Sequence, residues 1–415
     1  MQDNEKKPAL RFKGFTDPWE QRKLAEIANF SKGVGYSKND LCEEGTPIIL
    51  YGRLYTKYET SIFDVDTFVK ENAGSVYSKG GEVIVPASGE TAEDISIASV
   101  VVKPGILLGG DLNIVSPTTE YDSAFLALTI SSGAAHKYLS SLAQGKSVVH
   151  LHNADIQSVS AKFPTKREQE KIHLLFGKID TLITLHQRKY EKLVNIKKSM
   201  LDKMFPQNGA SMPEIRFKGF TDPWEQRKLG DAFERVVRKN TNNESRLPLT
   251  ISAQDGLVDQ ITYFNNRVAS RDVSNYYLVY NGEFAYNKST SDGYPFGAVK
   301  RLDWYEKGVL STLYIVFALK HPEKDDSDFM TVFYDTDRWH RGVAERAAEG
   351  ARNHGLLNIS ADDFFDIDTT MPEDKVEQEK IGRLLKKLDT LITLHQRKLE
   401  KLQNIKKACL EKMFV

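Results

Sequence analysis

Two long segments of the chain carry apolar residues at alternating steps of three and four positions. This period predicts amphipathic helices over residues 166–206 and 374–415. At about 1.5 Å per residue each helix would be roughly 60 Å long. Polar His186 and its copy His395 interrupt the stripes, so we expect a local irregularity there. The apolar stripes consist of Ile172, Leu175, Ile179, Leu182, Leu193 and Ile196 in the first segment and of Ile381, Leu384, Leu388, Leu391, Leu402 and Ile405 in the second.

The stretches before these helices, roughly 25–164 and 230–372, have a different pattern. Short apolar runs rich in Val, Ile, Tyr and Phe are bounded by Gly, Pro, Asn and Ser. Such runs predict strands and turns, with some helix between them. The expected fold class is therefore α+β, with two β-rich globular domains and two long helices.

The chain is also internally repeated. The fourteen letters RFKGFTDPWEQRKL begin at Arg11 and again at Arg216, and DTLITLHQRK begins at Asp180 and again at Asp389. The two offsets, 205 and 209, are nearly equal, which indicates a duplicated domain rather than a short-period solenoid. Weaker similarity remains between the copies, as in GEVIV and GEFAY. We predict domains over 1–165 and 207–373, followed by helices over 166–206 and 374–415.

Two equal helices with unburied stripes can bury those stripes against each other as an antiparallel pair. This predicts internal pseudo-twofold symmetry, with the globular domains at opposite ends of the pair. The repeated RFKGFTDPWEQRKL then marks the place where a helix end meets the next domain, and the ends of the chain should lie near each other. Phe12, Phe15 and Trp19 are expected to pack this junction; docking of a partner protein is the alternative role.

Composition sets limits on partners and on the compartment. The 415 residues include 57 Lys plus Arg and 57 Asp plus Glu, so no global cationic field attracts nucleic acid. Cys42 and Cys409 are too few for a disulfide framework and have no zinc-like spacing, which favours a reducing compartment. No signal peptide and no apolar run of about 18 residues is evident. We expect a cytoplasmic protein that does not enter a membrane.

The start of each predicted helix carries a P-x-x-x-E-Q-x-x-I segment. It is PTKREQEKI from Pro164, and PEDKVEQEKI, with one residue more, from Pro372. A variable domain, this segment, a long helix, and then the same order again resemble the specificity subunit of type I restriction-modification enzymes. The resemblance covers essentially the whole chain.

The resemblance implies a non-catalytic DNA reader. Each variable domain would be a target recognition domain that reads one half of an asymmetric bipartite sequence through the major groove of double-stranded DNA. The helices would set the spacing, which for two readers on one face of a duplex is roughly 34 Å, and would dock two DNA adenine methyltransferase subunits. Whether restriction or translocase subunits also join is left open, and no cofactor is expected.

Motifs for enzyme chemistry are incomplete. No N-P-P-Y or D-P-P-Y tetrapeptide of an adenine methyltransferase occurs, and the GKS at Gly145 has Ser140 where a phosphate-binding loop needs glycine. His150, His152 and His354 lack further ligands at metal-binding spacing. We therefore expect neither catalysis nor a metal site in this chain.

Polar, glycine-containing loops of the variable domains are the candidate DNA-binding segments, because Arg, Lys, Asn, Gln, Ser and Thr read base edges and hold phosphates. The alternative for each residue is a solvated loop side chain. By the resemblance, Ser88, Lys146, Lys288, Ser289 and Arg352 fall in DNA-facing loops. The full candidate set is Lys32, Tyr36, Ser37, Lys38, Asn39, Ser88, Gly89, Lys146, Ser147 and His150 in the first domain, and Asn287, Lys288, Ser289, Thr290, Arg346, Arg352, Asn353 and His354 in the second.

A second hypothesis comes from a different class of protein. The neutral net charge is also compatible with a pseudosymmetric adaptor whose two variable domains bind proteins. Strongly salt-dependent affinity for DNA would distinguish a DNA reader from such an adaptor. A self-sufficient nuclease or methylase is disfavoured by the missing motifs.

Overall fold

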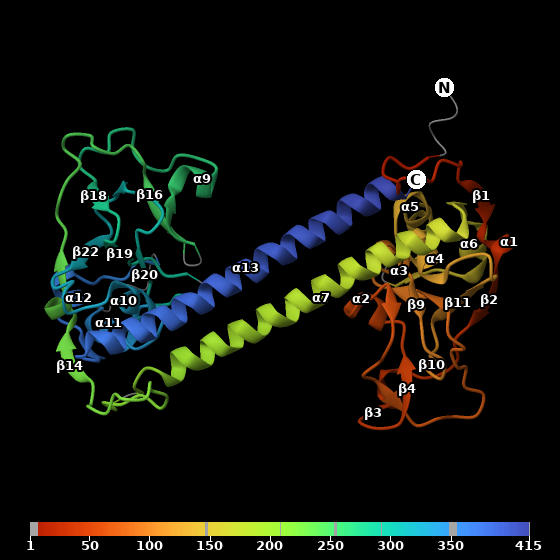
Figure 1. The fold of residues 1–415 in the computed structure, drawn as a ribbon, viewed down its shortest axis with the longest axis horizontal. Helices are drawn as coiled ribbons and strands as arrows, with labels where there is room; N and C mark the ends of the chain where they lie inside the picture. The colour runs from red at the N-terminus through yellow and green to blue at the C-terminus, as the bar shows by residue number, and fades with distance from the viewer. Residues whose placement is uncertain are drawn as a thin grey trace. The chain divides into compact units, whose positions relative to one another are not determined.

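The computed structural model describes residues 7–145, 148–207, 209–252, 255–291, 293–347 and 355–414. The chain forms two compact units (Figure 1). The first contains the residues up to Arg188 together with those from Gln396 onward, and the second is Lys189–His395. Each unit therefore contains one end of both long helices, α7 (Lys166–Lys203) and α13 (Lys375–Met413).

The first unit is built around a five-stranded sheet with the order β2-β11-β7-β9-β5, beside a four-stranded sheet with the order β10-β4-β6-β3. Its central strand β7 has the sequence EVIVP and is buried along its whole length. In chain order the elements are β1 (Glu20–Lys23), α1 (Leu24–Ile27), β2 (Ala28–Lys32), the 3-10 helix η2 (Lys38–Asp40), β3 (Leu41–Cys42), β4 (Thr46–Ile49), α2 (Arg53–Thr56), β5 (Ser61–Ile62), β6 (Phe68–Val69), β7 (Glu82–Pro86), β8 (Ser88–Gly89), α3 (Ala92–Ile95), β9 (Ser99–Val101), β10 (Leu107–Leu108), β11 (Leu112–Pro117), α4 (Ser123–Ile130), α5 (Gly133–Leu142), β12 (Val149–His150), α6 (Asn153–Ser158) and β13 (Ser160–Phe163).

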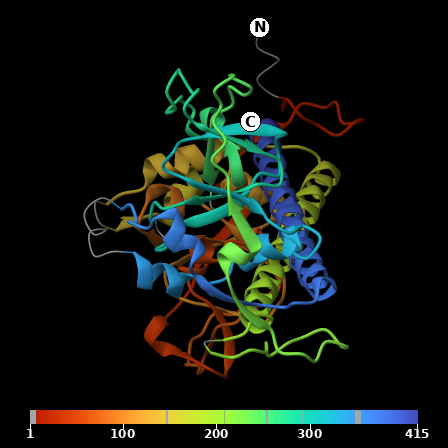
Figure 2. The same cartoon turned by 90° about the vertical axis from the view of Figure 1, so that its left-hand side faces the viewer.

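The second unit has a four-stranded sheet with the order β15-β22-β19-β20. Figure 2 faces this unit, with its strands in green and cyan and its later short helices in blue. Its elements are β14 (Glu225–Lys228), α8 (Leu229–Ala232), β15 (Phe233–Arg235), β16 (Leu249–Ser252), β17 (Gly256–Asp259), α9 (Gln260–Phe264), β18 (Tyr277–Tyr280), β19 (Phe284–Asn287), β20 (Ala298–Arg301), β21 (Lys307–Leu310), β22 (Ile315–Leu319), α10 (Ser327–Phe333), α11 (His340–Arg346), α12 (Ala361–Phe365) and β23 (Asp368–Met371).

The two units share one plan. The order β2-β11-β7-β9 in the first sheet corresponds to β15-β22-β19-β20 in the second, and the EQRK strands β1 and β14 pair with β13 and β23 in the same way. GEVIV and GEFAY, matched in the sequence, lie in the equivalent strands β7 and β19. The α+β fold with two β-rich bodies and two long helices is confirmed.

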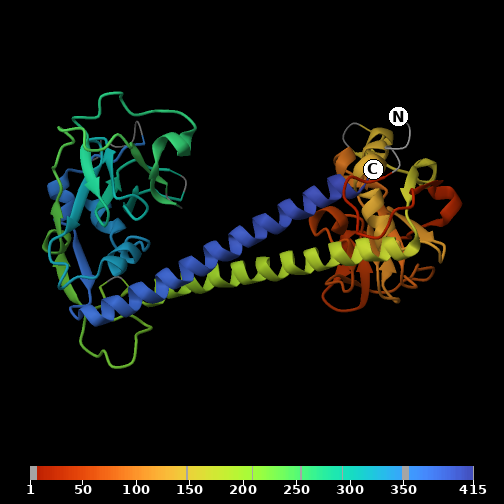
Figure 3. The same cartoon turned by 45° about the horizontal axis from the view of Figure 1, so that its top comes forward.

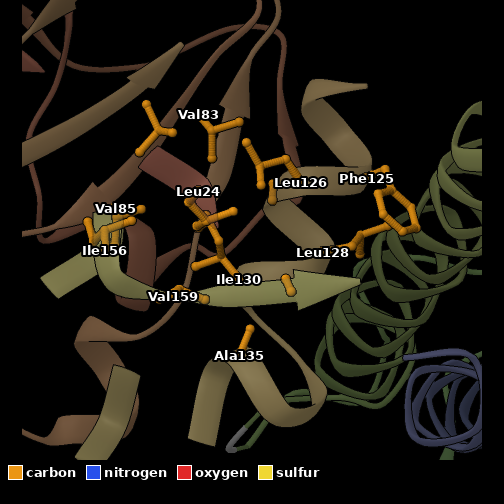
Figure 4. Close-up of a cluster of buried hydrophobic side chains, with 14 of the residues drawn as sticks. Leu24, Val83, Val85, Phe125, Leu126, Leu128, Ile130, Ala135, Ile156 and Val159 are labelled. Atoms are coloured by element: carbon orange, nitrogen blue, oxygen red, sulfur yellow. The ribbon is translucent and has the colours of Figure 1, made fainter. Parts of the chain in front are cut away.

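The main core of the first unit lies between its five-stranded sheet, helix α4 and the long helices. Figure 4 shows Val83 and Val85 on the sheet and Phe125 on α4 beside the long helices. Phe125 stacks on Phe414, the residue after α13, with ring centroids 5.4 Å apart, and contacts Trp19 edge-on at 5.8 Å. Burial of these aromatic side chains is a major stabilising term for the unit.

The second unit repeats this aromatic contact with residues from the end of α7. Phe205 stacks on Phe329 at 5.7 Å, and Trp224 contacts Phe329 edge-on at 6.1 Å. The end of α7 thus packs into the core of the second unit in the same way that the end of α13 packs into the core of the first. This confirms that the repeated RFKGFTDPWEQRKL, which contains Trp19 and Trp224, packs the junction between a helix end and a globular body.

Backbone hydrogen bonds fix the same junction. The N–H of Leu10 donates to the carbonyl of Lys412 at 3.0 Å, and the N–H of Ile215 donates to the carbonyl of Lys203 at 2.9 Å. Residues near both ends of the chain therefore meet in the first unit, as the sequence predicts. Figure 3 shows the end of α13 entering this unit.

Within each unit the two long helices are antiparallel neighbours. In the first unit Phe176 of α7 lies near Phe414, and Asp180 forms an ion pair with Lys406 of α13 at 2.6 Å, so sequence number rises along α7 as it falls along α13. In the second unit Lys197 of α7 pairs with Asp389 of α13, also at 2.6 Å.

Two details of the predicted helices are wrong. Both helices are continuous through His186 and His395, so no irregularity interrupts the backbone there. Most of the predicted stripe is buried or half-buried, but the side chains of Leu182 and Ile405 are 43% and 40% exposed. Ile183, the neighbour of Leu182, is half-buried in its place.

Candidate nucleic-acid interface

Two candidate loops of the first unit meet in a short antiparallel ribbon. Strand β8 follows the buried strand β7, and strand β12 precedes helix α6. Ser88 lies opposite His150 and Gly89 lies opposite Val149. The Ser88 hydroxyl is 3.2 Å from His150 Nδ1. The structure therefore brings together two candidates from distant loops, and we call this pairing the first ribbon.

The second unit places its corresponding loops together as well. Ser289 forms a β-bridge with Leu356, the N–H of Thr290 donates to the carbonyl of Gly355 at 2.7 Å, and the N–H of Leu357 donates to the carbonyl of Lys288 at 2.9 Å. We call this pairing the second ribbon. Both ribbons begin directly after the equivalent strands β7 and β19, so the sheet positions them in the same manner.

Some candidates in the first unit stabilise their own loop. The hydroxyl of Tyr36, a residue at φ 59°, lies 2.6 Å from Ser75 Oγ and accepts from the N–H of Asn72 at 2.7 Å. Ser37 caps η2 by accepting from the N–H of Asn39 at 3.3 Å and donating to Asp40 at 2.9 Å. These contacts give Tyr36 and Ser37 a structural role.

The remaining first-unit candidates differ in their surroundings. Lys32, Lys38, Asn39 and His150 are exposed. Gly89 is a packing position, because a Cβ there would lie 2.2 Å from the side chain of Ile95. Lys146 and Ser147 lie outside the described residues.

In the second unit several candidates use their polar groups internally. Asn287 Oδ1 accepts from the N–H of Ser289 at 3.0 Å, and Thr290 Oγ1 donates to the Gly355 carbonyl at 3.1 Å. Lys288 Nζ donates to the Ile359 carbonyl at 3.3 Å. These side chains shape the second ribbon, whereas the side chain of Ser289 is exposed.

Arg346 anchors the end of helix α11. Its guanidinium donates to the carbonyl of Asp366 at 2.7 Å and to the carboxylate of the same residue at 3.0 Å. The hydrogen bond from Lys228, followed by that from Arg346, lowers the pKa of Asp366. Arg346 is thus tied to its own unit. Arg352, Asn353 and His354 lie outside the described residues.

Sequence reasoning missed Gln144, which joins the first ribbon. Its N–H donates to the His150 carbonyl at 3.2 Å, and the N–H of His150 donates to the Gln144 carbonyl at 2.8 Å. The one local signal in the sequence was the following residue, Gly145, because glycine is typical of turns. The pairing with His150 is not encoded in any local periodicity.

Metal-binding clusters and membrane-spanning helices were sought in the described part of the chain. Within it, no group of three or more His, Cys, Asp or Glu side chains is placed to hold a metal ion. No helix in the same residues combines the length and apolar character that crossing a membrane requires.

Comparison with known families identifies one domain of the chain. Residues 16–195 match the family described as the type I restriction modification DNA specificity domain. These residues belong to that family, which confirms the resemblance seen in the sequence. The part of the chain over these residues is therefore a type I restriction modification DNA specificity domain. Comparison with curated proteins finds no match.

Solved structures support the fold. The S subunit of the type I restriction-modification system from M. genitalium is similar with a TM-score of 0.63 at 14% identity, over 99% of each chain. The HsdS subunit from Thermoanaerobacter tengcongensis, with a TM-score of 0.43 and 12% identity over 95% of this chain and 96% of that one, is too distant to add to this.

Proposed function

We propose that each unit reads one half of an asymmetric, bipartite target in double-stranded DNA through the major groove. The observation that supports this most strongly is that the two units have equivalent packing at the helix junction but carry different side chains on their ribbons. The frame contacts of Trp19 and Trp224 are equivalent, while the first ribbon presents His150 and the second presents Leu356. Unlike side chains on equivalent supports would select unlike half-sites.

The long helices would set the number of unread base pairs between the half-sites. Within each unit an ion pair joins the two antiparallel helices, Asp180–Lys406 in the first unit and Lys197–Asp389 in the second. A pair of continuous helices resists bending better than a flexible linker does, so it would hold two readers at a fixed separation. The domain boundaries that follow are those of the sequence: 1–165, 166–206, 207–373 and 374–415.

The helices would also dock two DNA adenine methyltransferase subunits, one for each repeat. Leu185 and Leu394 occupy the same position of the identical DTLITLHQRK segments, and both side chains are 44% exposed. Exposed apolar residues repeated in an identical setting are a reasonable surface for two copies of one partner. The neutral net charge fits this role, because partner subunits would contribute part of the cationic surface that DNA requires.

Mapping of methylated sites tests the proposal. The chain is combined with its cognate methyltransferase subunits and a DNA library, and the methylated positions are sequenced. We expect two unlike half-sites separated by a constant number of unspecified base pairs. A single continuous site, a palindrome, or methylation without sequence preference would contradict the proposal.

A further inference from the structure

The first ribbon has three side chains in one row. His150 exchanges both backbone hydrogen bonds with Gln144 on one side and lies opposite Ser88 on the other. Residues directly opposite each other in antiparallel strands carry their side chains on the same face. Gln144, His150 and Ser88 therefore share one face of the ribbon.

The backbone at this row is well fixed. Gly145 has φ 136°, and a Cβ at that position would lie 1.9 Å from the carbonyl oxygen of Val148, so only glycine suits position 145. On the other side, the N–H of Leu151 donates to the carbonyl of Ala87 at 3.0 Å. A reader of base edges needs such support, because a small displacement of the side chain loses its hydrogen bonds.

The three side chains differ in exposure and in hydrogen bonding. Ser88 is only 7% exposed, and its hydroxyl contacts His150 Nδ1. His150 and Gln144 are exposed, and within the described residues the side-chain amide of Gln144 has no hydrogen-bond partner. Ser88 thus orients the imidazole, and the amide of Gln144 is available to a ligand outside the protein.

The second ribbon uses the same frame in another register. Ser88 and Ser289 each lie six residues after a matching glutamate, Glu82 or Glu283. Ser88 faces His150, two residues before the N-cap of α6, whereas Ser289 faces Leu356, four residues before the N-cap of α12. A shift of two residues keeps the same face but changes which side chains meet. The ribbons therefore differ where base recognition would require a difference.

We propose that Gln144 reads a base of the first half-site and that its amide selects adenine, with His150 beside it and Ser88 as a positioning residue for the imidazole. The inference rests on the proposed function. A glutamine amide donates to N7 and accepts from the N6 amino group of adenine in the major groove, whereas a carboxylate accepts from the N4 amino group of cytosine. The side chain at position 144 thus predicts the base that is recognised: adenine for glutamine, and cytosine for a glutamate in its place.

The test uses the full subunit with its methyltransferase subunits and a library with randomised half-sites. The variant Gln144→Glu should change the preference from adenine to cytosine at one position of one half-site. The variant Gln144→Ala should reduce discrimination at that position by roughly ten- to a hundred-fold. Gln403→Ala, an exposed glutamine on α13, is the matched control and should leave both half-sites unchanged.

The outcomes separate the two proposals. A selective wild-type complex with unchanged base preference in both Gln144 variants would overturn the assignment of Gln144 alone. Evenly weaker methylation of all sequences would also overturn it, because that result indicates a phosphate contact or a folding defect. A wild-type complex without a bipartite target would overturn the proposed function, and the assignment with it.

Discussion

The guanidinium of Arg11 holds the carboxylate of Glu168 through two hydrogen bonds of 2.7 Å, and the Glu168 side chain is 0% exposed. The second unit repeats this pair between Arg216 and Glu377 at 2.6 and 2.8 Å. Each arginine begins the repeated RFKGFTDPWEQRKL, and each glutamate lies in the first turn of a long helix. The pair therefore ties the two recurring motifs of the chain to each other.

Removal of either arginine should destabilise its unit. Arg11→Met leaves the carboxylate of Glu168 buried without its partner, and loss of one partner of a buried ion pair costs about 3–5 kcal/mol of unfolding free energy. Arg216→Met should have the same effect in the second unit. Urea unfolding measured by far-ultraviolet circular dichroism gives these values.

Two controls accompany this prediction. Adding Glu168→Leu to Arg11→Met should recover most of the loss, because no buried charge remains. Arg22→Met, which breaks the exposed contact with Glu20, should leave stability almost unchanged. An equal loss in Arg22→Met and Arg11→Met would show that burial of the pair is unimportant.

Asp122 and Asp326 occupy equivalent positions, but the pKa of their carboxyl groups is shifted in opposite directions. Each caps a helix by accepting an N–H three residues later, from Phe125 or Phe329, at 2.7 Å. Burial disfavours both carboxylates. At Asp122 the contact with His173 and the capping hydrogen bond outweigh burial and lower the pKa, whereas at Asp326 burial prevails and raises the pKa.

The sign of the pH dependence therefore differs. The folded pKa of Asp122 lies below the unfolded value of about 3.9, so its stabilisation is present above that value and is lost as the pH falls through the folded pKa. Asp326 is the reverse, and its ionisation costs stability as the pH rises through its folded pKa. At pH 7, Asp122→Asn should destabilise by about 1 kcal/mol, while Asp326→Asn should be neutral or stabilising. Equal losses in the two variants, measured by urea unfolding, would refute this difference.

The ion pairs between the long helices are also unequal. In the first unit Lys406 contacts Asp180, which also accepts from Thr60 Oγ1 at 3.1 Å. In the second unit Lys197 contacts both Asp389 and Asp335. Burial disfavours the Lys197 ammonium, but the two carboxylates outweigh this effect and raise its pKa.

Lys197→Met should therefore destabilise the protein more than Lys406→Met. The first change removes a cation from two partly buried carboxylates and should cost about 2–3 kcal/mol, compared with about 1 kcal/mol for the second. The difference in urea midpoint between the two variants checks this expectation. A larger loss in Lys406→Met would show that Lys300, which also contacts Asp335 at 2.9 Å, compensates fully for Lys197.

The helices and the repeat could be predicted because their signals are long and redundant. The three-four period extends through both helices, and identical letters mark both junctions. The exposure of Leu182 and Ile405 could not be predicted, because the angle at which two helices meet depends on both surfaces at once. The contact between Asp180 and Lys406 could not be predicted either, because the pattern of apolar residues carries no information about pairs of charged residues.

The candidate site was predictable only at the level of loops. Polar residues in the same loop can face DNA or satisfy their own backbone, and the sequence does not distinguish Ser37, which caps η2, from Lys38, which is exposed. The place of Gln144 follows from its pairing with His150 and from the pairing of His150 with Ser88, 62 residues away. Such register is set by tertiary contacts rather than by local pattern.

Lengthening the helices should widen the gap in the DNA target. Insertion of seven residues into both helices, after Arg188 and before Gln396, preserves the facing stripes, because seven residues are close to two turns. The helices would grow by about 10 Å, which is about three base pairs of duplex. Methylated-site sequencing should then show unchanged half-sites with about three more base pairs between them. Insertion into one helix alone is the control and should reduce stability, and an unchanged gap in the double insertion would refute the spacing role.

Each ribbon should control only one half-site. Ser289→Ala with Leu356→Ala removes an exposed hydroxyl and an apolar side chain that would contact a thymine methyl group, so preference in one half-site should fall by roughly ten-fold or more. Ser88→Ala with His150→Ala should alter the other half-site and leave the first unchanged. Lys288 is kept in both variants, because its ammonium supports the Ile359 carbonyl. If sequencing of methylated sites showed both half-sites changing together in either variant, the two units could not be independent readers, and the division of labour between the ribbons would be wrong.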